Sequence, residues 1–141
     1  MNKLLPGNLL SGALILFALL ANSTYANSRQ QTVDIASGDE ITFEVYGKNT
    51  STRILWVGPN YGIQERHKQA ASKLAAAGMQ VWFVNITESL FMPGGAESMR
   101  KVPGEVIADL VEKLSDKGRY QVVIISSGYG GIPVLRGAHT W

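Results

Sequence analysis

Hydrophobic and polar residues alternate along the first patterned part of the chain. Residues 32–36 and 41–46 alternate with a period of two, and the turn-forming sequence Ser-Gly-Asp-Glu at 37–40 separates them. This arrangement predicts a β-hairpin. The polar residues 27–31 that precede it carry no pattern, and we expect them to fray.

Three later runs are apolar without alternation, at residues 53–57, 80–86 and 120–125. Continuous apolar runs of this length are typical of strands that are buried on both faces, as in a parallel sheet. The aromatic residues within these runs, Trp56, Trp82 and Phe83, are therefore expected in the core.

Two segments between these strands have helical periodicity. Residues 63–77 place Ala70, Ala71 and Leu74 on one face, and residues 105–117 carry a wider apolar stripe. Gly78 and Gly118 are suited to end the two helices, and Pro103 to open the second. Residues 87–101 include Pro-Gly-Gly and show no clear period, which predicts a long loop.

The predicted order is therefore hairpin, strand, helix, strand, helix, strand. Strands that alternate with helices indicate an α/β fold of three layers (α/β/α), in which a hairpin precedes three mostly parallel strands. Residues 27–141, about 115 in number, suffice for one domain and are too few for two.

Residues 1–26 have the pattern of a cleaved secretory signal. Lys3 precedes an apolar stretch at 9–21, and small or polar residues end at Ala26. The stretch of about 13 residues falls short of the roughly 20 that a membrane-spanning helix needs. We therefore expect an exported protein, periplasmic or secreted, with no stable membrane span after cleavage. The chain has no cysteine, which excludes disulfides.

Charge gives no reason to expect nucleic acid as a partner. Lys3 is one of 13 Lys and Arg residues, so 12 remain after cleavage against 11 Asp and Glu. A nearly balanced surface lacks the basic excess with which proteins bind phosphate backbones.

The sharpest motif is Ser126-Ser127-Gly128-Tyr129-Gly130, directly after the third apolar strand. It resembles the nucleophile elbow of the α/β-hydrolases, whose pattern is small-x-nucleophile-x-small, because the chain turns sharply and bulky flanks do not fit. Ser126 and Gly130 match the small flanks. Gly128 stands where the family has its nucleophile, and glycine supplies no nucleophilic atom.

The resemblance to the N-terminal half of the α/β-hydrolase fold extends over residues 32–141. It places residues 58–62, Gly-Pro-Asn-Tyr-Gly, at the oxyanion loop, although the His-Gly sequence common there is missing. Since Pro59 has no N–H, Asn60 or Tyr61 would have to donate to an oxyanion. The family's catalytic acid and histidine follow later strands, so no position up to Trp141 matches them. The resemblance implies ester or acyl substrates and, for this sequence, an incomplete hydrolase-like chain.

Other residues are weaker candidates for catalysis. Ser127 as the nucleophile would have Ile125 and Tyr129 as flanks, and Ser126 would have Ile124, all too large for the elbow. His67 lies between Arg66 and Lys68 and is expected on the solvated face of its helix. His139 lies two residues from Trp141 and is poorly placed as a base.

Tyr61 and Tyr129 follow the carboxyl ends of strands, which is where open α/β sheets bind ligands, so both are candidates to line a pocket. A dinucleotide site is disfavoured because the third glycine of its fingerprint falls at Pro133. The chain has no cysteine and no histidine pair at ligand spacing, so we expect neither a cofactor nor a metal.

Three functions remain open from the sequence, and with them the question whether the chain is an enzyme. The first is an exported hydrolase-like protein. The second is a non-catalytic relative that binds a partner or a small molecule at the loop edge. The third is an exported domain that associates with itself, because strand 120–125 would form an open sheet edge.

Overall fold

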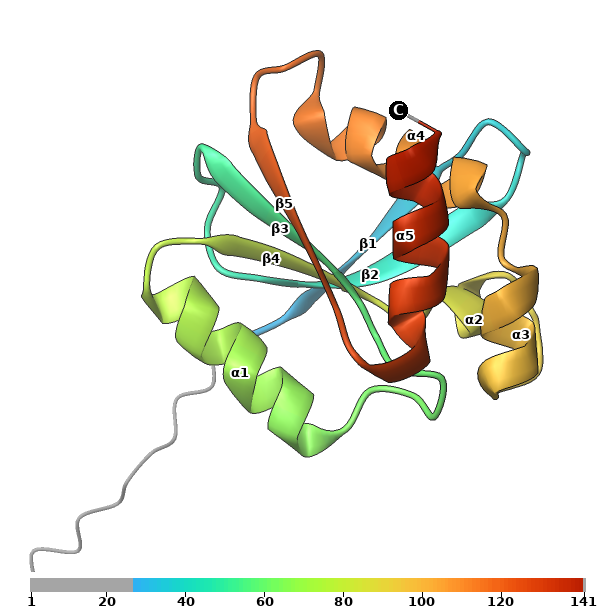
Figure 1. Ribbon diagram of the computed structural model, residues 1–141. Coiled ribbons are helices and arrows are strands. Elements are labelled where there is room, and N and C mark those ends of the chain that lie inside the picture. The colour runs from blue at the N-terminus through green and yellow to red at the C-terminus, as the bar shows by residue number, and fades with distance from the viewer. Residues whose placement is uncertain (1–26, 141) are drawn as a thin grey trace, which may run out of the picture.

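A five-stranded mixed sheet forms the centre of residues 27–140, which are the residues that the computed structural model describes (Figure 1). The predicted signal segment 1–26 lies outside them. The strands are ordered β1-β2-β4-β3-β5 across the sheet. Their bounds are β1 Arg29–Asp34, β2 Glu40–Tyr46, β3 Thr52–Val57, β4 Gln80–Val84 and β5 Gln121–Ser126.

The hairpin and the parallel strands predicted from the sequence are both present. β1 and β2 pair antiparallel, β2 pairs antiparallel with β4, and β3 pairs parallel with both β4 and β5. β1 begins earlier than predicted, since Arg29 pairs with Val45 and Gln31 with Phe43. The expectation of fraying is therefore wrong for residues 29–31, because backbone pairing with β2 orders a segment whose side chains carry no pattern.

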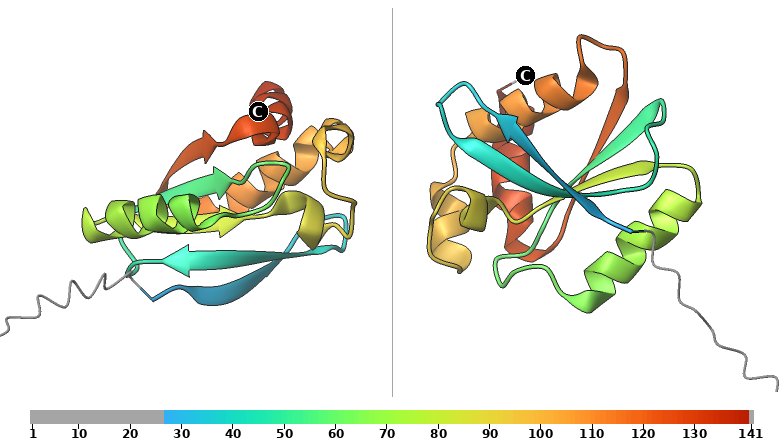
Figure 2. Two further views of the ribbon diagram at one scale, coloured as in Figure 1. Left: turned by 90° about the horizontal axis from the view of Figure 1, so that it is seen from below. Right: turned by 180° about the vertical axis from the view of Figure 1, so that it is seen from behind.

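Helices cover both faces of the sheet, which confirms the α/β fold. The helices are α1 Glu65–Ala76, α2 Ile86–Ser89, α3 Ala96–Lys101, α4 Gly104–Ser115 and α5 Gly131–His139, and a 3₁₀ turn η1, Gly128–Gly130, precedes α5. α4 and α5 lie together on one side (Figure 2). Along β4, Trp82 and Val84 join the core beneath α4, whereas Val81 and Phe83 join the core beneath α1.

Burial separates the central strands from β5. All five residues of β4 and the last four of β3 are buried, as their continuous apolar sequences predict. β5 lies at one end of the sheet, and no residue of this strand is buried in the described chain. Val123 is 40% exposed. The expectation of an open edge is confirmed, whereas that of full burial for 120–125 is wrong.

Residues 86–101 differ from the prediction. The strand predicted at 80–86 ends at Val84, and Ile86 is the first residue of α2. The loop predicted at 87–101 contains the rest of α2 and all of α3. Ser98 and Met99 of α3 are buried. The guanidinium of Arg136, on α5, donates hydrogen bonds to the carbonyls of Arg100 and Val102 at the end of α3. Contacts from a distant element therefore support a helix too short to show a period.

α4 and α5 approach closely through a pair of glycines. A Cβ at Gly137 would lie 2.7 Å from the Cβ of Ile107, and one at Gly104 would lie 2.8 Å from the carbonyl carbon of Arg136. Only glycine at these two positions allows the helices to approach so closely. This contact fixes the position of α5, which follows the turn after β5. Within residues 27–140, no helix is both long and apolar enough to cross a bilayer.

Candidate functional site

Three turns meet at the carboxyl ends of the parallel strands. Residues 58–62 follow β3, Asn85 follows β4, and Ser127 begins the turn after β5. The N–H of Gly58 donates to the carbonyl of Val84 at 2.8 Å, and the N–H of Ser127 donates to the carbonyl of Val57 at 3.1 Å. The sheet ladder therefore extends one residue past the strands and holds the turns together. This edge is where open α/β sheets bind ligands.

Gly130 packs directly against the end of β3. A Cβ at Gly130 would lie 2.4 Å from the carbonyl oxygen of Gly58 and 2.8 Å from that of Val57. Both neighbours are backbone atoms, so no rotamer change makes room. The turn after β5 thus has the steric demand that a nucleophile elbow places on its second flank.

Gly128 occupies the tip of this turn with φ +54°, in the left-handed region. A Cβ built there would lie 3.5 Å from the Cβ of Pro59 and 3.7 Å from Oδ1 of Asn60, at ordinary contact distance. A side chain at position 128 would therefore face the loop after β3. Glycine leaves this position without a reacting atom.

The hydroxyl of Ser127 is engaged elsewhere. Its Oγ accepts a hydrogen bond of 2.8 Å from Nε1 of Trp56, which is buried in the core beneath α1. An indole N–H is a donor only, so Ser127 satisfies the hydrogen-bonding requirement of a buried residue. Ser126, the first flank, is exposed.

The two predicted oxyanion-loop residues lie beside a cavity of about 560 Å³. Asn60, Tyr61 and Asn85 line it together with Glu88. The carbonyl of Asn60 accepts the N–H of Gly95 at 3.0 Å, which ties this loop to residues 93–95. Oδ1 of Asn60 lies 3.7 Å from the place of a Cβ at Gly128, so this loop and the turn after β5 are neighbours.

The two tyrosines are both exposed at this edge. Tyr61 accepts a hydrogen bond of 2.7 Å from the guanidinium of Arg66 on its phenol oxygen. The guanidinium carbon of Arg100 lies 5.8 Å from the ring centre of Tyr129. Tyr61 lines the cavity at the loop, whereas Tyr129 is absent from the lining of that cavity.

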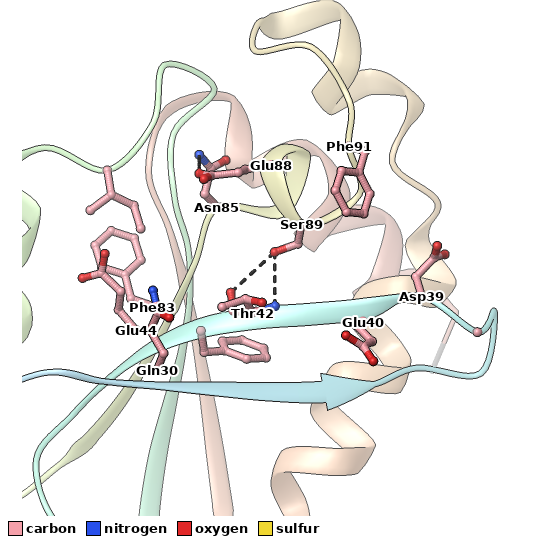
Figure 3. Close-up of a pocket in the computed structure, with 13 residues that line it drawn as sticks. Gln30, Asp39, Glu40, Thr42, Glu44, Phe83, Asn85, Glu88, Ser89 and Phe91 are labelled. Atoms are coloured by element: carbon pink, nitrogen blue, oxygen red, sulfur yellow. Dashed lines mark hydrogen bonds between the residues drawn. The ribbon is translucent and has the colours of Figure 1, made fainter.

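A second cavity of about 560 Å³ adjoins the first through Asn85 and Glu88 (Figure 3). It lies over β2, where the hydroxyl of Ser89 accepts the N–H of Thr42 at 3.3 Å. Its lining includes the carboxylates of Asp39, Glu40, Glu44 and Glu88 and the apolar rings of Phe83 and Phe91. The sequence does not reveal this cavity, because its walls come from the hairpin and from α2, most of which was predicted as loop.

His67 is buried, so the expectation that it lies on the solvated face of its helix is wrong. Its ring packs edge-on against Trp56 and Phe83, with ring centres 6.2 Å and 6.0 Å away. Neighbours on a helix point about 100° apart, so the charges of Arg66 and Lys68 do not report the direction of residue 67.

His139 is exposed at the last residue of α5, whereas the elbow lies before the first. Nine helical residues span about 13 Å, which is beyond the reach of a general base. Among residues 27–140, no three His, Asp or Glu side chains converge in a group that would hold a metal ion.

This chain is similar to a known protein in its fold. No family model matches the chain, and no curated protein matches its sequence. A solved structure described as brefeldin A esterase, a bacterial homologue of human hormone-sensitive lipase, superimposes with a TM-score of 0.52 at 18% sequence identity. The match covers 86% of this chain. The chain therefore has a partial α/β-hydrolase-like fold. The chain spans 37% of the length of that esterase.

Proposed function

We propose that this chain is an exported α/β-hydrolase-like protein that is catalytically incomplete and binds a small molecule at the loop edge of its sheet. The observation that carries the proposal is Gly128. Its positive φ and its position opposite Pro59 and Asn60 support its alignment with the nucleophile of the α/β-hydrolases, and it has no side chain. The fold shared with the esterase supports a hydrolase ancestry, and the activity in the name of that protein suggests ester ligands for this chain.

The cavity beside Asn60 suggests the kind of ligand. Asn60 and Asn85 contribute amide groups and Glu88 contributes a carboxylate, which accepts a hydrogen bond from Asn85 at 2.9 Å. Amide and carboxylate oxygens suit a ligand that carries hydrogen-bond donors, such as hydroxyl or amide groups. A short-chain hydroxy ester combines this chemistry with the ester class that the fold suggests.

The absence of a nucleophile is tested with a fluorophosphonate probe, which labels activated serines. The purified protein should remain unlabelled, and it should not hydrolyse p-nitrophenyl butyrate faster than buffer does. Ser127→Ala and Ser126→Ala are the matched controls. Labelling that disappears in Ser127→Ala would identify Ser127 as a nucleophile and overturn the proposal.

The open edge of β5 supports a second function, which is completion of the sheet by another strand. The N–H groups of Gln121 and Ser127 point to β3, so by alternation those of Val122, Ile124 and Ser126 point outward. No charged residue interrupts Gln121–Ser126, and an uncharged, apolar edge is a template for strand pairing. Further strand–helix units of a longer protein or a second copy of the chain would fill it.

Self-association through this edge is measured by sizing chromatography over a range of protein concentrations. The wild type should elute as a dimer at high concentration. Val123→Lys places a charge on the half-exposed edge and should shift the protein to a monomer, whereas Leu135→Lys, at an exposed site on α5, should not. A wild-type monomer at all concentrations would exclude self-association for this chain.

A further inference from the structure

His67 acts as the N-terminal anchor of α1. The backbone N–H of Gln64, the residue that caps this helix, donates a hydrogen bond of 3.0 Å to Nδ1 of His67. The first N–H groups of a helix have no partner within the helix, so this acceptor satisfies one of them. The bond also fixes the protonation state, because only an imidazole with a bare Nδ1 accepts it.

The same side chain links the loop after β3 to the turn after β5. Gln64 lies two residues beyond Gly62, where the loop after β3 ends, and the ring centre of Tyr61 lies 6.2 Å from that of His67. His67 also packs on Trp56, whose Nε1 donates to the hydroxyl of Ser127 in the turn after β5. His67 therefore contacts the loop directly and reaches the elbow through one intervening side chain.

The surroundings of His67 disfavour a positive charge. Burial lowers the pKa of His67 below its usual 6.5, and the positive charge of Arg66 lowers the pKa further. β3 and β4 present the uncharged rings of Trp56 and Phe83 to it, and the loop presents the phenol of Tyr61, which Arg66 also contacts. On α1, the ammonium of Lys68 lies 4.0 Å from the carboxylate of Glu44 on β2.

Protonation of Nδ1 removes the acceptor and places two donors opposite each other at the start of α1. A basic group whose pKa is lowered by folding binds fewer protons in the folded than in the unfolded state. The stability that it contributes is complete above pH 6.5 and is lost as the pH falls through the lower pKa of the folded state.

We propose that His67 is a proton-sensitive latch, which holds the loop at residues 58–62 in place near neutral pH and releases it in acid. The relevance of this regulation rests on the proposed function, since the released loop borders the ligand cavity. Asn60, Tyr61 and Gly62 of this loop line the cavity, so release of the loop in acid should weaken ligand binding.

NMR spectroscopy of the whole folded protein tests the latch with an internal control. The chain has two histidines, so the ring signals of His67 and His139 are followed in one titration from about pH 8 to about pH 4. The amide signals of Tyr61 and Gly62 should shift with the midpoint of His67, below 6.5. If they are unchanged, or shift with the midpoint of His139, the latch is refuted.

Variants separate the proton from the packing. His67→Asn keeps an acceptor at the place of Nδ1 and cannot titrate, so its loop amides should remain in their neutral-pH positions across the range. His67→Ala should show the released loop already at neutral pH, and His139→Asn should behave as the wild type. An unchanged acid transition in His67→Asn would overturn the proposal. These NMR measurements need neither ligand nor catalysis, so a result that refutes the latch does not affect the proposed function. Labelling of a serine by the fluorophosphonate probe would contradict the proposed function and would not affect the latch.

Discussion

Replacement of Gly130 by alanine tests the contact between the turn after β5 and the end of β3. The added Cβ would lie 2.4 Å from the oxygen of Gly58 and 2.8 Å from that of Val57. φ is −58° at Gly130, so alanine causes no strain of its own and the cost is steric. Insertion of a methyl group into a tightly packed site costs about 1–3 kcal/mol, and a fixed backbone on both sides favours the upper half of that range.

The two neighbouring glycines provide matched controls. At Gly131 a Cβ would meet Oγ of Ser126 at an ordinary 3.4 Å with φ −64°, so Gly131→Ala should stabilise the fold by about 0.4–1 kcal/mol through reduced freedom of the unfolded chain. At Gly128 there is room for a methyl group, but φ is +54°, so Gly128→Ala should cost about 1–2 kcal/mol from backbone strain.

Urea unfolding followed by circular dichroism measures all three variants, with changes in midpoint compared at equal slope. The expected order of stability is Gly131→Ala, wild type, Gly128→Ala and Gly130→Ala. If Gly130→Ala is as stable as the wild type, the turn does not pack on β3 as described. If Gly131→Ala loses as much as Gly130→Ala, the cost comes from the residue type and not from the contact.

Three further outcomes are expected. Ser127→Ala leaves the buried Nε1 of Trp56 without its acceptor and should lower the free energy of unfolding by about 1–3 kcal/mol. Ser127→Thr keeps a hydroxyl and should retain most of the wild-type stability. Equal stability of the two variants would contradict the role of the hydroxyl. Arg53→Met removes a guanidinium that donates to the carbonyl of Leu114 at 2.9 Å and lies 3.5 Å from the ring centre of Tyr120. This change should lower the free energy of unfolding by about 1–2 kcal/mol in the same assay. The control is Arg119→Met, at an exposed arginine, which should change the stability by less than about 0.5 kcal/mol. Export should remove residues 1–26, so N-terminal sequencing of the periplasmic or secreted protein should begin near Asn27, and recovery of an intact N-terminus would contradict a cleaved signal.

The sheet was predictable because its strands are defined by local patterns. Residues 80–84 are apolar throughout and prove to be buried on both faces, and the alternation at 41–46 matches the alternating burial at the start of β2. α3 was not predictable, since six residues are too few to show a period and part of its support comes from Arg136, which lies more than thirty residues later.

The candidate site was predictable where it depends on backbone shape and not where it depends on side-chain partners. Gly128 and Gly130 are recognisable because a tight turn restricts residue type locally. The bond between Ser127 and Trp56 joins residues 71 positions apart, and the sequence shows no sign of it. The burial of His67 was missed for a similar reason, because its environment consists of rings on β3 and β4.

The position of β3 in the middle of the parallel strands has a consequence for the time course of folding. β3 is synthesised before both of its neighbours, and its pairing of Thr52 with Gln121 must close a loop of about 70 residues. Pairings this distant in sequence form slowly, since chain entropy is lost before the contacts compensate for it. The sheet therefore cannot add β5 until residue 126 has been synthesised, and until then β3 is paired along one edge only.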